Sequence, residues 1–182
     1  KVIKADASFN SVKTEFNPLP FVPSNNGDLD KRVREIFDIQ ANALATRLES
    51  CNIKKVIIGI SGGLDSTLAL LVAVKAFKIL SRDLSDIIGI TMPGFGTSER
   101  TKSNAEVLME KLGISSLCID ITDGCKQTMK DIGLDPDNRT VTYENVQARK
   151  RTEYLMDYAN LQGGIVLGTG DLSEAALGWC TY

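Results

Sequence analysis

Residues 56–67 read Val56-Ile57-Ile58-Gly59-Ile60-Ser61-Gly62-Gly63-Leu64-Asp65-Ser66-Thr67. The apolar first half predicts a buried strand, and the second half predicts a glycine turn that opens onto a helix near Thr67. A helix N-terminus presents unpaired backbone N–H groups and a partial positive charge, and both favour a bound phosphate. A strand, a glycine turn and a helix in this order therefore predict a phosphate-binding loop.

The side chains of this turn add groups that a bound nucleotide needs. Gly62 and Gly63 lack a Cβ, so the backbone can lie close to phosphate oxygens. The Asp65 carboxylate stands where a phosphate-bound magnesium ion would sit. Further hydroxyl donors come from Ser61, Ser66 and Thr67. A tight turn without a ligand is the alternative, although a plain turn has no need of these groups in this order. The loop is not a Walker A motif, because no Lys follows the glycines.

Length and charge narrow the class of protein. A chain of 182 residues is long enough for one domain with a hydrophobic core. A net charge of −2 gives no electrostatic reason to expect a nucleic-acid or acidic-membrane partner. No apolar run approaches the roughly 18 residues of a membrane span, and the N-terminus does not resemble a signal peptide. Lys1 in place of Met indicates a piece of a longer chain.

Histidine and cysteine usage excludes several kinds of catalytic site. The chain has no histidine, which removes Ser-His-Asp and Cys-His catalysis. Its four cysteines are widely spaced, so a zinc site is not expected. Cys118 lies in an apolar run, where we expect a reduced thiol in the core. Reduced cysteines favour a cytoplasmic protein.

The remaining pattern predicts a linker, a long helix and then an α/β domain. Residues 1–28 are rich in Pro, Asn and Gly, which is typical of an extended linker. Asp28 or Asp30 is expected to cap a helix that ends near Ser50. The apolar face of this helix is expected to pack on the sheet; it carries Val33, Ile36, Phe37, Leu44 and Leu48.

Short apolar runs alternate with helical patterns from Lys55 onward. We expect strands at 55–60, 86–92, 116–121 and 164–168, and helices at 66–80, 98–112, 122–131 and 141–160. Gly113 and Gly163 are expected to end two of these helices. The alternation predicts an α/β fold: a doubly wound parallel sheet with helices on both faces. Its binding crevice is expected at the carboxyl ends of the strands.

Two further segments carry candidate polar groups. Asn145 and Arg149 are four residues apart and share a helix face, where Arg149 can offer bidentate donors to a phosphate or carboxylate. A solvated basic face is the alternative. After the last strand, Thr169 can bind a nucleotide, and Glu174 can supply a second carboxylate for magnesium opposite Asp65. Taken alone, this last segment also reads as a strand exit and a helix capped by Ser173.

The loop after the second predicted strand has no single interpretation from its sequence. Residues 92–98 contain one proline and two glycines, which indicate a loop, and Thr97 or Ser98 can cap the next helix. A connector without a ligand and a substrate lid both remain open.

These motifs resemble known families. The run Ser61-Gly62-Gly63-Leu64-Asp65-Ser66 resembles the pyrophosphate loop of the N-type ATP pyrophosphatases. Together with Asn145-Val146-Gln147-Ala148-Arg149 and Gly168-Thr169-Gly170-Asp171-Leu172-Ser173-Glu174, it resembles the NAD synthetase family, in its glutamine-dependent, long-chain branch. The resemblance implies an adenine nucleotide alpha hydrolase-like, Rossmann-like fold. It also implies ATP-dependent amidation of nicotinic acid adenine dinucleotide through an acyl adenylate.

The resemblance also implies roles for individual residues. ATP would be held by Thr169 and by the loop residues Gly59, Ile60, Ser61, Gly62, Gly63, Leu64, Asp65, Ser66 and Thr67. Asp65 would bind Mg2+, Glu174 would bind Mg2+ or substrate, and Asp65 and Glu174 would be the catalytic carboxylates. The dinucleotide would contact Asn145, Arg149, Glu174 and Trp179.

The resemblance further implies a domain plan and partners. Residues 1–28 would be the linker from a glutaminase domain that supplies ammonia in cis, and residues 29–182 a synthetase domain truncated at its C-terminus. The family also implies a homo-oligomer. The alternatives are another N-type pyrophosphatase, such as a GMP synthetase-like ligase, and a non-catalytic ATP-binding fragment.

Overall fold

The chain divides into two units, Lys1–Ile36 and Phe37–Tyr182, and the second unit contains the sheet. A computed structural model describes residues 19–95 and 99–178, apart from Phe21 and Ser24. No helix among these described residues is both long enough and apolar enough to cross a bilayer.

Four parallel strands form one sheet. They are β1 (Val56–Gly59), β2 (Ile87–Thr91), β3 (Ser115–Cys118) and β4 (Ile165–Val166), arranged in the order β3-β2-β1-β4. Val56 of β1 is in register with Ile87 of β2 on one side and Ile165 of β4 on the other. Three of the four strands fall within the predicted segments, β3 begins one residue before its predicted segment, and each strand is shorter than predicted.

The helices alternate with the strands as predicted. They are α1 (Asn26–Ser50), α2 (Leu64–Ile79), α3 (Glu99–Leu112), α4 (Thr122–Asp131), α5 (Val141–Gln162) and α6 (Leu172–Leu177), with a short 3₁₀ turn η1 (Leu84–Asp86) before β2. Gly113 follows α3 with φ +70°, and Gly163 follows α5 with φ +64°. Both residues adopt the left-handed conformation that favours glycine, so both predicted helix ends are confirmed.

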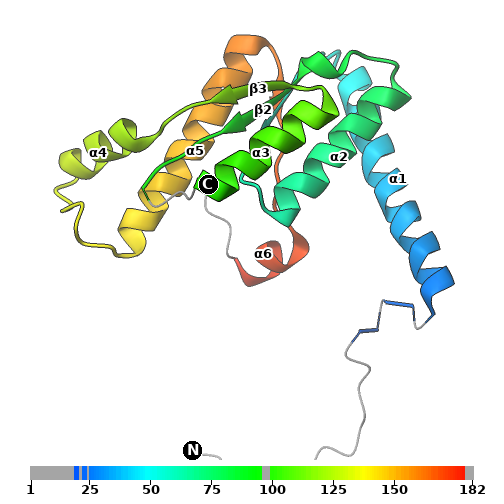
Figure 1. The fold of residues 1–182 in the computed structure, drawn as a ribbon, viewed down its shortest axis with the longest axis horizontal. Coiled ribbons are helices and arrows are strands. Elements are labelled where there is room, and N and C mark those ends of the chain that lie inside the picture. The colour runs from blue at the N-terminus through cyan, green and yellow to red at the C-terminus, as the bar shows by residue number, and fades with distance from the viewer. Residues whose placement is uncertain (1–18, 21, 24, 96–98, 179–182) are drawn as a thin grey trace, which may run out of the picture. The chain divides into compact units, whose positions relative to one another are not determined.

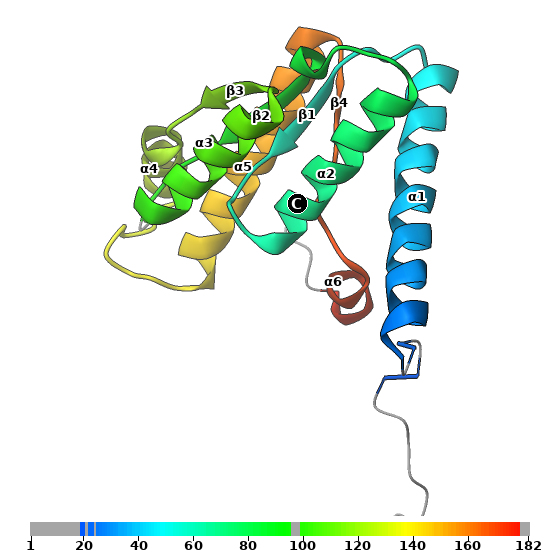
Figure 2. The ribbon, with the colours of Figure 1, turned by 45° about the vertical axis from the view of Figure 1, so that its right-hand side comes forward.

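The helices cover both faces of the sheet. One core cluster joins Val56 and Ile58 of β1 to residues of α1, α2 and α3. On the opposite face, Ile57 of β1 and Ile90 of β2 pack with Ala159 of α5. Figures 1 and 2 show α2 and α3 on one side of the strands and α5 on the other. The doubly wound α/β fold is confirmed.

Topology places a crevice between the exits of β1 and β4. The chain leaves β1 toward β2 on one side, and it later returns to add β4 on the other side of β1. At such a switch point the loops after the two strands diverge onto opposite faces and leave room for a ligand. The strand order therefore favours a crevice at the carboxyl ends of the strands, as the sequence predicted.

Three local predictions are wrong. The first helix begins at Asn26, and the Asn25 side chain accepts a hydrogen bond from the Asp28 N–H at 2.8 Å, so neither Asp28 nor Asp30 caps it. Val33 and Ile36 are 56% and 49% exposed, because the buried face of this helix begins only at Ala41. Cys118 is exposed, since alternate residues of the edge strand β3 face outward.

Cys125 of α4 is the buried thiol among the described cysteines. It packs with Ile121, Met129 and Tyr143 in a cluster between α4 and α5. Burial raises the pKa of the Cys125 thiol above its ordinary value. The thiol therefore acts here as a small apolar core group.

Candidate functional site

The glycine turn connects β1 directly to α2. The Ile60 N–H still donates to the Ile90 carbonyl at 2.9 Å, so the chain leaves the sheet only after Ile60. Gly62 has φ +82°, and Gly63 is the N-cap of α2, with no side chain to cap the helix. An α-helix has four N–H groups at its start without partners inside the helix. The turn therefore leaves donors of α2 for an anion, as the sequence predicted.

The hydroxyl groups of the turn bond to the turn itself. Ser61 Oγ accepts a hydrogen bond from the Gly63 N–H at 3.2 Å and lies 3.2 Å from Ser66 Oγ. Ser66 Oγ and Thr67 Oγ1 both donate to the Gly63 carbonyl, at 3.1 and 2.8 Å. Ser66 is only 3% exposed. These hydroxyls hold the shape of the loop that presents the backbone donors.

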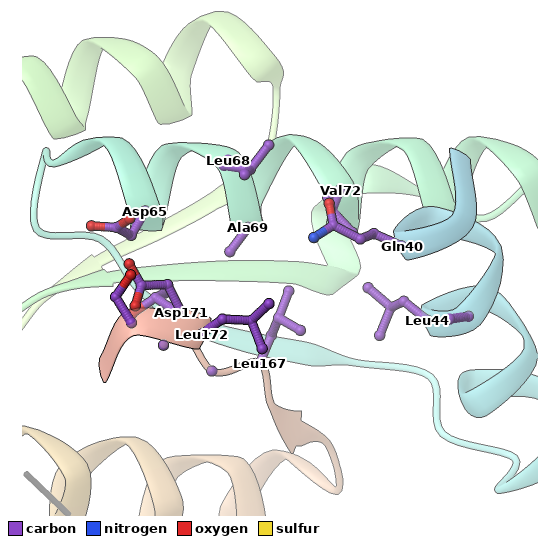
Figure 3. Close-up of a pocket in the computed structure, with 14 residues that line it drawn as sticks. Gln40, Leu44, Asp65, Leu68, Ala69, Val72, Leu167, Asp171 and Leu172 are labelled. Atoms are coloured by element: carbon purple, nitrogen blue, oxygen red, sulfur yellow. The ribbon is translucent and has the colours of Figure 1, made fainter. Parts of the chain in front are cut away.

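A cavity of about 770 Å³ opens beside this turn. Three parts of the fold line it: α1, the first half of α2 and the segment after β4 (Figure 3). Its lining is Gln40, Ala43, Leu44, Asp65, Leu68, Ala69, Val72, Leu167, Gly168, Thr169, Gly170, Asp171, Leu172 and Ser173. The cavity therefore brings Asp65 and Thr169 together across the β1–β4 switch point, although they are far apart in sequence.

Two carboxylates lie at one end of the cavity. Asp65 comes from the first turn of α2 and Asp171 from the start of α6, and Figure 3 draws both beside the beginning of α2. In the part of the chain that the structure describes, no group of three or more His, Cys, Asp or Glu side chains converges as a metal site. Magnesium is commonly held by one or two carboxylates together with substrate phosphates. The pair Asp65 and Asp171 fits that donor set.

Glu174 does not line the cavity, because it belongs to the cap of α6. The Asp171 carboxylate accepts a hydrogen bond from the Glu174 N–H at 2.7 Å, and Glu174 Oε2 accepts one from the Asp171 N–H at 3.0 Å. Asp171 is therefore the N-cap, and the expectation that Ser173 caps this helix is wrong. The spacing Asp171-x-x-Glu174 is itself a capping-box signal, and it could have identified Asp171 from the sequence.

The candidate substrate residues of α5 lie outside the cavity. Asn145 is half-buried and Arg149 is exposed, and neither is among the cavity residues. Trp179 lies outside the described residues. Among the candidate ATP residues, the cavity thus brings Asp65 and Thr169 together, and its lining does not include Asn145 or Arg149.

The first half of the loop after β2 is packed against the protein. The Pro93 carbonyl accepts a hydrogen bond from the Ile121 N–H at 3.0 Å, and the ring of Phe95 lies 5.6 Å from that of Tyr143. The second half, residues 96–98, lies outside the described residues. The described half is therefore a packed connector, which is one of the two interpretations that the sequence left open.

Comparison with known proteins identifies the family. A family model described as NAD synthase matches residues 36–182. The chain belongs to the NAD synthase family. Its similarity extends to glutamine-dependent NAD+ synthetases of Mycobacterium leprae, 49% identical over 173 residues and 92% of this chain, and of Thermotoga maritima, 37% identical over 170 residues and 91% of this chain. The chain spans 25% and 26% of those two NAD synthase family members.

Two solved structures have a fold similar to that of this chain. A glutamine-dependent NAD+ synthetase of Acinetobacter baumannii, solved with ADP, matches 82% of this chain with a TM-score of 0.75 and 30% identity, over 28% of its own length. An NMN synthetase of Francisella tularensis matches 81% of this chain with a TM-score of 0.70 and 27% identity, over 58% of its own length.

Proposed function

We propose that this chain is the ATP-binding part of an enzyme that amidates nicotinic acid adenine dinucleotide to NAD. The observation that carries the proposal is the Ser61–Ser66 loop, which opens onto α2 beside a cavity shared with Thr169 and Asp171. The glutamine-dependent NAD+ synthetases that resemble 92% and 91% of the chain support this reaction. The ADP in the A. baumannii structure supports an adenine nucleotide as ligand.

In the first step, the nicotinate carboxylate attacks the α-phosphorus of ATP. The bond from that phosphorus to the bridging oxygen breaks, pyrophosphate leaves, and an acyl adenylate forms. The N–H groups at the start of α2, which no side chain caps, would bind the phosphates as negative charge builds on the leaving group. The hydrogen bonds of Ser61, Ser66 and Thr67 keep these donors in place before ATP arrives.

A magnesium ion bound by Asp65, with Asp171 beside it, would offset the charge on the departing pyrophosphate. Glu174 holds Asp171 through the capping box, and through this contact we propose that it supports the metal side of the site. Thr169 lines the same cavity and is proposed to contact ATP.

In the second step, ammonia attacks the acyl carbon, AMP leaves, and the extra proton of the new amide passes to solvent. We propose that the exposed guanidinium of Arg149, with Asn145 one turn before it, binds the dinucleotide, and that Trp179 packs near its nicotinate end. Arg149 and the cavity come from different parts of the fold, so the long dinucleotide would extend between them.

We further propose the family's domain plan for the whole protein. A glutaminase domain in cis would supply ammonia, with residues 1–28 as its linker and residues 29–182 as synthetase domain. A homo-oligomer in the cytoplasm completes the proposal.

The test is an assay with MgATP, nicotinic acid adenine dinucleotide and ammonium, read by mass spectrometry for NAD and AMP. It uses this chain and the chain extended to the length of its relatives. Asp65→Asn keeps the side-chain volume but removes the charge, and should lower product formation at least about 100-fold. Asp157→Asn, at an exposed position of α5, is the matched control and should keep the parent rate. Parent-like rates in Asp65→Asn would overturn the metal assignment, and no product from the extended chain would overturn the substrate.

The likeness to the F. tularensis NMN synthetase favours a second candidate, a mononucleotide acid as substrate. The same assay with nicotinic acid mononucleotide decides between them. The dinucleotide proposal requires a higher kcat/KM with nicotinic acid adenine dinucleotide, and the reverse order would favour the second candidate.

A further inference from the structure

One face of α5 holds the segment that leaves β2. Residues 92–95 follow β2 at the carboxyl end of the sheet, where the loop after the neighbouring strand β1 also emerges. The α5 contact face consists of Tyr143, Gln147 and Arg151, which are spaced four residues apart and so lie along one side of the helix. Tyr143 and Gln147 are 5% and 3% exposed, and Arg151 is half-buried.

Two of these residues make close packing contacts with the segment. The Tyr143 and Phe95 rings are 5.6 Å apart and tilted by 39°. A Cβ added at Gly94 would lie 3.1 Å from Gln147 Oε1, so the backbone there is in close contact with the Gln147 side chain. These packing contacts restrict the position of residues 92–95, but they do not form a hydrogen bond to Met92.

Arg151 makes the hydrogen bond to Met92. Its Nε–H donates to the Met92 carbonyl at 3.2 Å, in a partly buried position. A guanidinium is always charged and planar, so this bond is stronger and more directional than one between neutral groups. It joins the middle of α5 to the first residue after β2.

Met92 in turn lies against Gly59, two residues before the proposed phosphate loop, residues 61–66. A Cβ added at Gly59, the last residue of β1, would lie 3.3 Å from Met92 Cε and 3.1 Å from Leu155 Cδ1. Ile60 and the glycine turn follow immediately. A shift of the Met92 side chain would therefore displace Gly59, which lies just before the loop, because protein interiors are close-packed and transmit displacement.

We infer that Arg151 is a positioning residue for the phosphate loop and acts on it through Met92. Only the expected effect on ATP binding, a weaker affinity when the Arg151–Met92 contact is lost, rests on the proposed function. Arg151 is not among the residues that line the cavity. Its role differs from that of Arg149, which is exposed two residues earlier on the same helix.

The experiment compares Arg151→Leu with Arg82→Leu. Arg82 Nη1 donates to the Ile53 carbonyl at 2.7 Å, before β1 at the opposite end of the strand, so both variants lose an arginine-to-carbonyl hydrogen bond. Each protein is labelled at the methionine methyl carbons for NMR, and its Kd for MgATP is measured by calorimetry. Arg151→Leu should shift the Met92 methyl resonance and raise the Kd about tenfold. Arg82→Leu should change neither, and Arg151→Lys should restore much of the affinity.

Two results would overturn the inference: an unmoved Met92 resonance in Arg151→Leu, or an equal loss of affinity in Arg82→Leu. Should Arg151→Leu fail to fold, Met92→Ala carries the test. It keeps Arg151 and removes the methyl group beside Gly59, and it should raise the Kd to a similar extent. Parent-like affinity in a folded Met92→Ala would also reject the inference. A parent protein that binds no MgATP would reject the proposed function, whereas the Met92 resonance, which needs no ligand, would still decide the positioning role.

Discussion

Gly62 is the residue at which the phosphate loop changes direction. Its φ of +82° lies in the region that side chains with a Cβ rarely adopt. The residues on either side of it are hydrogen-bonded to each other: the Gly63 N–H donates to Ser61 Oγ at 3.2 Å. The loop therefore depends on one backbone conformation, and its hydroxyl bonds require that conformation.

Gly62→Ala should weaken MgATP binding about tenfold, because the added Cβ costs roughly 1–2 kcal/mol in the left-handed region and displaces the loop donors. Gly133→Ala is the matched control. Gly133 has φ +70° after α4, with nothing within 4 Å of an added Cβ. Both variants should lose similar stability in urea unfolding, and only Gly62→Ala should lose affinity in calorimetry. Equal affinities for the two variants would contradict a role for the Gly62 conformation in binding.

At the scale of the element, the short strand β4 pairs with β1 at a point that leaves no room for a side chain. It has only two residues, and its pairing with β1 begins where the Ile165 N–H donates to the Lys55 carbonyl at 3.1 Å. A Cβ added to the preceding residue, Gly164, would lie 2.7 Å from that same carbonyl and 2.6 Å from Ile57 Cδ1. The strand can approach β1 only because Gly164 has no side chain.

Gly164→Ala should therefore lower the free energy of unfolding by about 2 kcal/mol and the Tm by about 5 °C, through overpacking against β1. Gly168→Ala is the control for stability, since nothing lies within 4 Å of a Cβ at that position. Calorimetric unfolding of the two variants measures the difference. A Gly164→Ala protein as stable as Gly168→Ala would show that β4 can move away from β1 at little cost.

At the scale of the whole molecule, the cavity joins elements that are distant in sequence. Its apolar wall comes from α1 and α2, while Thr169 and Asp171 come from the segment after β4. Binding there would link three parts of the fold, so a ligand should stabilise the folded state as a whole.

MgATP at about 100 times its Kd should add roughly 2.7 kcal/mol to the free energy of unfolding, which raises the Tm by about 5–10 °C. Removing the metal with EDTA should abolish most of this rise, because the phosphates would then meet Asp65 and Asp171 without a cation between them. Thermal unfolding with MgATP, with ATP plus EDTA and with MgAMP measures the effect. The same rise in all three conditions would argue against a metal–pyrophosphate site.

The sequence alone determined the order of elements and the strand, glycine turn and helix at residues 56–67. Apolar runs, helical spacing and glycine stops predicted β1–β4 and their helices, because side-chain period and left-handed glycine conformations are local properties of the chain. The residues of the glycine turn could also be identified from the sequence, because they are adjacent in the chain. Local patterns did not predict which of these side chains are buried. Cys118 is exposed because β3 is an edge strand, and Val33 and Ile36 are exposed as well.

Only the tertiary structure decided which candidate groups meet. It placed Asp171 beside Asp65, used Glu174 to hold Asp171, and left Arg149 outside the cavity. It also brought Arg151 to Met92, 59 residues away, so that α5 supports the start of the phosphate loop. Such contacts depend on how distant elements pack and on where the sheet reverses its winding, and neither is encoded in the spacing of neighbouring residues.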